Sequence, residues 1–227
     1  MSEQSISQTD KSKPVKKARN KPRSNKGGNA QRLRSFPKLL VKLELRHHLT
    51  STSFERNYHY YLQSFVSVTV ALGRADVSRS TDVVKDFITG VITEARKDLE
   101  ETKKLLAAHI EDAEGEVQQT ITDVIRHDAE VPNNAAHQYI ELYKAADEVV
   151  DHVYCAEILS KLDEDKKREI LEHIRQILIR PTSCYSRLSA KVDKRLSSID
   201  TKGSDAKDAM LELLVQIIDE DPSRNPV

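Results

Sequence analysis

Hydrophobic and polar positions alternate near residue 40, in the stretch around which the predicted fold is organised. One side of an extended backbone would carry Leu39, Val41, Leu43 and Leu45, and the other would carry Lys38, Lys42, Glu44 and Arg46. This period of two predicts a half-buried β-strand, in which Leu40 is an exception on the charged side. A short amphipathic helix is the alternative, because Leu39, Leu40 and Leu43 also share one helical face.

The hydrophobic residues after this strand recur at helical spacing, so we predict that most of the remaining chain is α-helical. The predicted helices cover residues 52–72, 78–113, 117–125, 135–162, 163–180, 182–199 and 205–218. Thr52 and Asp163 are predicted to cap two of them, and Pro181 is predicted to end one. Residues 65–72 are ambiguous, because their sequence, FVSVTVAL, also alternates as a strand would.

A lone strand leaves its backbone N–H and C=O groups unpaired, which is costly where they are buried. We therefore expect the strand to pair antiparallel with the same strand of a second copy. If residues 65–72 formed a strand, the partner would instead lie in the same chain. The predicted fold class is mainly α with one N-terminal β-strand, arranged as a ribbon-helix-helix-like dimer with a helical extension.

Charge is unevenly distributed along the chain. The first 34 residues hold ten basic and two acidic residues, a charge of +8, so the remainder carries −8 for the formal net charge to be zero. This arm has almost no large apolar side chain, and we expect it to be disordered when free. Lysine and arginine in such an arm can neutralise DNA phosphates. The arm residues expected to do so are Lys16, Lys17, Arg19, Lys21, Arg23, Arg32 and Arg34.

A two-stranded antiparallel ribbon fits the major groove of B-form DNA. In such a ribbon Lys42 and Arg46 are predicted to donate to guanine, while Glu44 accepts from cytosine or holds its neighbours. The residues expected to contact phosphate outside the arm are Lys38, His48, Arg74, Arg79 and Ser80. The predicted domains are the arm at 1–34, a strand-helix-helix DNA-binding region at 35–113 and a helical extension at 114–227.

The motifs of common enzymes are missing from the sequence. No glycine-rich phosphate loop and no HExxH motif occurs, and Cys155 and Cys184 are the only thiols. Glu148, His152 and Cys155 could share a helical face, but a surface Glu–His pair beside a buried cysteine explains them as well. We therefore expect no enzyme activity, no metal and no cofactor. With no signal sequence and no run long enough to cross a bilayer, we expect a soluble intracellular protein that binds no membrane.

The run RLRS at Arg32–Ser35, followed by the pattern LxLxR at Leu43, Leu45 and Arg46, resembles the family of AcaB-type transcriptional regulators of conjugative plasmids and related integrating elements. The resemblance implies a bacterial, dimeric ribbon-helix-helix protein that binds double-stranded DNA and activates transfer genes. It places base reading on the outward residues of Leu39–Arg46. For the helical extension at 114–227, two roles stay open: further oligomerisation, or contact with the transcription machinery.

A helical scaffold or adaptor is the alternative from a different functional class. In that case the acidic body binds a protein partner and the basic arm is only a targeting signal.

Overall fold

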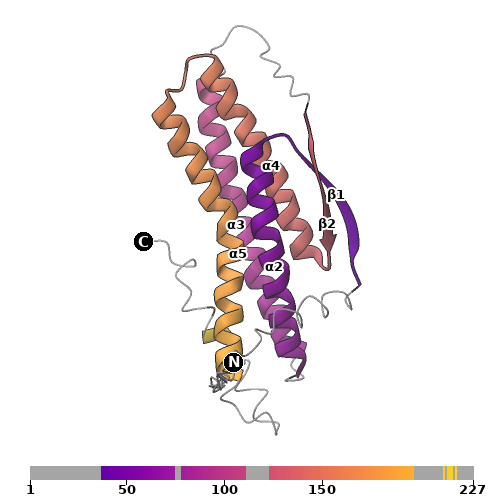
Figure 1. Cartoon of the computed structure of the whole chain (residues 1–227). Helices are drawn as coiled ribbons and strands as arrows, with labels where there is room; N and C mark the ends of the chain where they lie inside the picture. Colours follow the sequence, from indigo (N-terminus) through magenta and orange to yellow (C-terminus); the bar gives the residue numbers. More distant parts are fainter. Residues whose placement is uncertain are drawn as a thin grey trace, which may run out of the picture.

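The computed structural model describes residues 37–74, 78–110 and 123–196, together with 212, 214–216 and 218. Four long helices lie side by side in an elongated bundle, and a two-stranded sheet runs along one side of it (Figure 1). In chain order the elements are β1 (Leu39–Leu45), α2 (His48–Arg74), α3 (Ser78–Ile110), β2 (Ile125–Val131), α4 (Asn134–Ile158) and α5 (Glu164–Leu196). The mainly helical fold class is confirmed.

The strand predicted near residue 40 is confirmed as β1, and the helical alternative for it is wrong. Its hydrogen-bonding partner, however, is β2 of the same chain, which pairs with β1 antiparallel from Leu39↔Val131 to Leu45↔Ile125. The expectation of a single strand is therefore wrong. The partner expected from the sequence was the same strand of a second copy, whereas β2 of the same chain supplies the missing backbone groups.

The sequence did not reveal β2, and its first residue, Ile125, was expected to end a helix. The strand IRHDAEV contains four charged or titratable side chains and few large aliphatic ones. Its inward positions follow the pleat, since Ala129 and Val131 are buried while Arg126 and Asp128 are exposed. With so few large aliphatic residues, β2 lacks the clear alternation of hydrophobic and polar positions by which β1 was predicted from the sequence.

Several predicted helices are confirmed with changed ends. Residues 65–72 are helical within α2, so the competing strand interpretation is wrong. The predicted break at Pro181 is also wrong, because α5 continues through this residue to Leu196. Burial of apolar residues on both sides of the proline, Ile177, Leu178, Tyr185 and Leu188 among them, offsets the hydrogen bond that a proline removes from a helix. Asp163 does cap α5, accepting from the Lys166 N–H at 2.7 Å.

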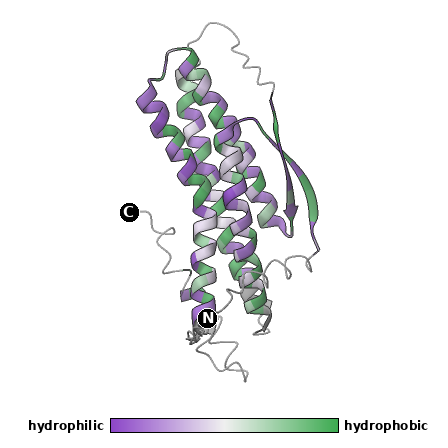
Figure 2. Cartoon of the chain, in the orientation of Figure 1, coloured by the Kyte–Doolittle hydropathy of each residue, from purple (hydrophilic) through white to green (hydrophobic). Residues whose placement is uncertain are grey.

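Each helix contains both hydrophobic and hydrophilic residues, recurring along its length as in an amphipathic helix (Figure 2). Both predicted regions, 35–113 and 114–227, contribute to the same buried core, and the boundary between them lies outside the described residues. Aromatic rings fill its centre: Tyr61 lies 4.8 Å from Tyr139 and 5.2 Å from Tyr185, between ring centroids. The Tyr58 hydroxyl donates to the Glu130 carbonyl at 2.8 Å and so joins α2 to β2.

Candidate functional site

The outward side of the β1–β2 sheet, here called the outer ribbon face, is where the sequence placed the DNA-reading side chains. Its charged residues are Lys38, Lys42 and Glu44 on β1 and its N-terminal flank, and Arg126, Asp128 and Glu130 on β2. Three are basic and three acidic, so β2 neutralises the positive charge that β1 would have presented alone. Sequence analysis did not predict this balance of charges because it did not predict β2.

Two of these cations are held in ion pairs across the ribbon. Arg126 Nε donates to Glu44 Oε1 at 3.1 Å, and Lys38 Nζ contacts Glu130 Oε1. Lys42 lies opposite Asp128 in the register but makes no ion pair with any described residue. Within the described part of the outer ribbon face, Lys42 is thus the cation with most freedom to contact a ligand.

The inward side of β1 largely follows the prediction. Leu43 and Leu45 are fully buried, and Val41 is partly buried against the core. Leu39, predicted to be inward, is 71% exposed, and Leu40, predicted as the exception, is 66% exposed. Leu39 is the first residue of β1 and lies beside Pro37, Val131 and Pro132, where the ribbon offers little to cover it.

Arg46 was predicted to read a base, but the structure places it against α4. Its Nε lies 3.3 Å from Asp147 Oδ2, and its Nη2 contacts Asp151. The side chain keeps only 38% of its surface exposed. Two carboxylates therefore hold the guanidinium, and the observed contacts give Arg46 an anchoring role between the end of β1 and α4.

The adjacent histidines differ in their surroundings. His47 is buried, with Nε2 2.5 Å from Asp151 Oδ1 and its ring stacked 5.3 Å from that of Tyr154. His48, predicted to contact phosphate, is exposed at the first residue of α2, with Nε2 3.2 Å from the Thr52 hydroxyl.

Asp147 of α4 is the residue that organises this junction, and sequence analysis did not select it. Asp147 is 3% exposed, and its carboxylate accepts from the backbone N–H groups of Arg46 at 2.8 Å and His47 at 3.1 Å. The Thr50 hydroxyl lies 2.5 Å from the same carboxylate. This side chain from another helix caps α2, which is why α2 begins at His48 and the predicted Thr52 cap is wrong.

A signal for Asp147 was present in the sequence. Asp147 follows Tyr143 by one helical turn and precedes Val150 by nearly one, so it lies within the apolar stripe of α4. A carboxylate on a buried stripe needs hydrogen-bond donors from elsewhere in the fold.

Other predicted phosphate contacts lie outside the described side chains. Arg74 is the last residue of α2, and Arg79 and Ser80 lie in the first turn of α3, but their side chains are not among those described. The whole basic arm also lies outside the described residues. All of these assignments stay predictions.

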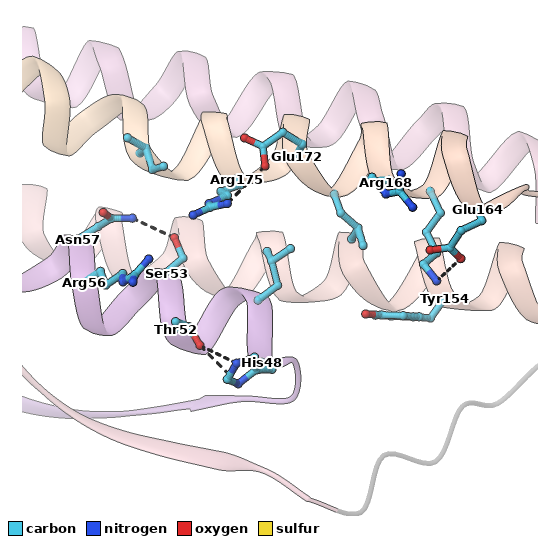
Figure 3. A pocket seen from close by; sticks show the side chains of 14 residues that line it. His48, Thr52, Ser53, Arg56, Asn57, Tyr154, Glu164, Arg168, Glu172 and Arg175 are labelled. Carbon is cyan, nitrogen blue, oxygen red and sulfur yellow. Dashed lines mark hydrogen bonds and ion pairs between the residues drawn. The ribbon is translucent and has the colours of Figure 1, made fainter.

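A second candidate site is a groove between the N-terminal halves of α2 and α5, here called the α2–α5 groove (Figure 3). Its volume is about 540 Å³, and Tyr154 of α4 lies at one end of it, near Glu164 (Figure 3). Its charged lining residues are Arg56, Lys167, Arg168, Arg175, Glu164 and Glu172. The sequence did not select this groove, because it joins residues more than a hundred positions apart.

The Glu148, His152 and Cys155 set makes local contacts. Glu148 pairs with Lys103 at 3.0 Å, and His152 Nδ1 lies 2.8 Å from the Glu148 carbonyl oxygen. Partial burial, and secondarily the charge of Asp151, raise the pKa of the Cys155 thiol, which disfavours a reactive thiolate. Among the described residues no group of three His, Cys, Asp or Glu side chains is arranged to hold a metal ion.

Within residues 37–74, 78–110 and 123–196, none of the helices combines the length and the apolar character that crossing a bilayer requires.

No protein-family model matches the sequence, and no curated protein sequence matches it. The structure is similar to the crystal structure of AcaB from uropathogenic E. coli, with a TM-score of 0.67 at 16% sequence identity. The match covers 82% of this chain and 98% of AcaB. The resemblance drawn from the sequence is therefore confirmed at the level of the fold, and the chain has an AcaB-like fold.

Proposed function

We propose that this protein is a non-enzymatic, DNA-binding transcription regulator that acts as a homodimer or higher oligomer. The observation that carries the proposal is the direct connection between the +8 arm and the ribbon, since Pro37 begins the described chain and β1 begins two residues later. An arm anchored there would deliver phosphate-binding cations beside the outer ribbon face. The AcaB-like fold supports the same proposal.

The β1–β2 pair retains the geometry that the major groove requires. A two-stranded antiparallel ribbon can enter that groove whether its strands come from one chain or two. On this ribbon Lys42 is exposed and without an ion pair among described residues, and Arg126 is 76% exposed beside Glu44. We assign base contact to Lys42 and Arg126, with Glu44 orienting the latter. Lys38 and His48 lie nearer the ends of the ribbon and are assigned to phosphate.

The proposed dimer needs a different contact from the β1–β1 pairing expected from the sequence. β2 occupies one edge of β1, which leaves the other edge of each strand outside this pairing. Exposed strand edges can pair with another copy. A symmetric dimer through one of these edges would join two ribbons into one sheet and set the spacing of two DNA half-sites.

The test is a gel-shift titration of the full chain on a genomic-fragment mixture at increasing salt. The proposal predicts retention of particular fragments and binding that weakens steeply with salt. A helical scaffold with a targeting arm predicts no preference for any duplex over competitor DNA. Equal loss of all fragments on competition would overturn the proposal in favour of the scaffold.

A further inference from the structure

The α2–α5 groove carries positive charge that the proposed DNA contact does not use. Lys167 is neutralised locally, because its ammonium lies 2.6 Å from Glu157 and 2.8 Å from Glu164. The remaining charged lining residues are three arginines, Arg56, Arg168 and Arg175, against the single acid Glu172. Arg168 also has an acidic neighbour, Asp165 at 3.8 Å, so Arg56 and Arg175 are the two arginines of the groove on which a bound anion would depend most.

Two of these arginines come from opposite walls of the groove. Arg56 of α2 and Arg175 of α5 direct their guanidinium groups into the space between the two helices (Figure 3). Arg56 makes no ion pair with a described residue, and Arg175 has only the 3.5 Å contact with Glu172, whose side chain is 52% exposed. Such exposed pairs are weak, so Arg175 can turn toward a bound anion at little cost.

The groove also has an apolar part to its lining. Leu49, Leu171 and Ile179 line it together with the ring of Tyr154, and the Thr52 hydroxyl adds a neutral donor. All four apolar or aromatic side chains are partly buried. An inorganic anion would leave this surface uncovered, whereas a ligand with an apolar or aromatic part would cover it.

The dimensions of the groove limit what can enter. A volume of about 540 Å³ falls in the usual range for small-molecule sites, roughly 300 to 1,000 Å³. Packed helices lie about 8 to 10 Å apart, whereas the major groove of a DNA duplex is by itself about 12 Å wide. A duplex is therefore too large for the space between α2 and α5, and a small molecule fits.

We propose that the α2–α5 groove binds a small organic phosphate ester, with the phosphate between Arg56 and Arg175 and the organic part against Leu49 and Leu171. Arginine is suited to this role because its planar fork donates two parallel hydrogen bonds to phosphate oxygens. The site lies in one chain and does not depend on DNA binding, so the proposal goes beyond the function proposed above and can fail separately from it.

Isothermal titration calorimetry on the full chain tests the proposal with three probes: adenosine monophosphate, adenosine and inorganic phosphate. We expect saturable binding of adenosine monophosphate, and binding of each of the other two weaker by about tenfold or more, since each lacks one half of the ligand. The double variant Arg56→Gln with Arg175→Gln should lose about tenfold or more of the affinity for adenosine monophosphate. Because both side chains are exposed, its melting temperature should match that of the wild type.

The matched control is Arg96→Gln, which removes an exposed arginine of α3 paired with Glu100 at 3.6 Å, outside the groove. Its affinity for adenosine monophosphate should equal that of the wild type. No saturable binding of adenosine monophosphate, or binding unchanged in the double arginine variant, would overturn the proposal. Binding of single-stranded oligothymidylate that is lost in the double variant, without binding of adenosine monophosphate, would also overturn it and assign the groove to a nucleic-acid strand.

Discussion

The carboxylate of Asp147 accepts a hydrogen bond from the backbone N–H of His47 at 3.1 Å, across a separation of 100 residues in the sequence. The same side chain accepts from the Arg46 N–H at 2.8 Å, so one buried group fixes both the end of the ribbon and the start of α2. The position of Lys42 on the outer ribbon face depends on this junction, because β1 runs directly into it.

Replacement of Asp147 by alanine should therefore destabilise the protein strongly. The change leaves two backbone N–H groups without their acceptor, leaves the Thr50 hydroxyl with only the His47 carbonyl, and removes a carboxylate partner of Arg46. Lost capping and buried unsatisfied donors together should lower the free energy of unfolding by about 2 to 4 kcal/mol. Urea denaturation measures this, with Asp128→Ala on the exposed outer ribbon face as the control that should change little. Equal stability of the two variants would contradict the capping role.

The two sides of β1 should respond differently to truncation. Leu43 is fully buried, so Leu43→Ala should lower the free energy of unfolding by about 2 to 5 kcal/mol through lost burial and the cavity left behind. Leu39 is 71% exposed, and Leu39→Ala should change it by about 0.5 kcal/mol or less. Denaturant midpoints of the two variants provide the comparison. A large effect at Leu39 in dilute protein would indicate that another surface covers this end of the ribbon.

Removal of the hydroxyl group should change the stability of the protein differently at two buried tyrosines. The Tyr139 hydroxyl donates to the Leu178 carbonyl at 2.8 Å and lies 2.7 Å from the Thr182 hydroxyl, while the Tyr61 hydroxyl has no hydrogen-bond partner among the described residues. Tyr139→Phe should therefore destabilise by about 1 to 3 kcal/mol, and Tyr61→Phe should be neutral or stabilising. Thermal unfolding at neutral pH measures both. The opposite order would show that Tyr61 has a partner that the structure does not contain.

Alkaline pH should unfold this protein more readily than its composition alone implies. Burial raises the pKa of Tyr61, Tyr139, Tyr143 and Tyr185 above the ordinary value of 10.0. Above pH 10 the unfolded chain releases phenolic protons that the folded chain keeps, so the free energy of unfolding falls as pH rises. Below about pH 10, the ordinary pKa of tyrosine in the unfolded chain, this stabilisation is fully present. Each such tyrosine contributes a slope of up to about 1.4 kcal/mol per pH unit.

Melting temperatures measured from pH 8 to 11 test this dependence. Tyr61→Phe should reduce the alkaline loss of stability, whereas Tyr60→Phe should not, because Tyr60 is 60% exposed. An identical alkaline slope in the wild type and Tyr61→Phe would contradict the assignment of the loss to buried tyrosines.

The parts of the fold that sequence predicts are those whose pattern is local. The alternation through Leu43 and Leu45 identifies β1, and the apolar stripe of α3 from Val84 to Leu106 identifies that helix, because burial of one side imposes the period. Pro181 shows where prediction from a local pattern fails. Proline usually ends a helix, yet packing of the residues around Pro181 keeps α5 continuous.

The site was less predictable than the fold, because its contacts join distant segments. The sequence identifies Lys42 as outward, but the neutralising partners on β2 and the Asp147 cap follow from the pairing of residues 80 to 100 positions apart. Arg46 illustrates the consequence, since its place in the alternation assigns it to the outer side while Asp147 and Asp151 turn it onto α4. Charge on a strand cannot be assigned a role until the neighbouring strand is known.

Selection of duplexes from a random DNA library by the full-length protein, followed by sequencing, is the decisive measurement for the proposed function. We predict that the wild type enriches a defined motif and that Lys42→Ala loses this motif while keeping the wild-type melting temperature. Lys97→Ala, which removes an exposed lysine of α3, should retain it, and deletion of residues 1–34 should weaken binding to all duplexes about equally. Failure of the wild type to enrich any motif, or an identical motif selected by Lys42→Ala, would contradict DNA reading by the outer ribbon face.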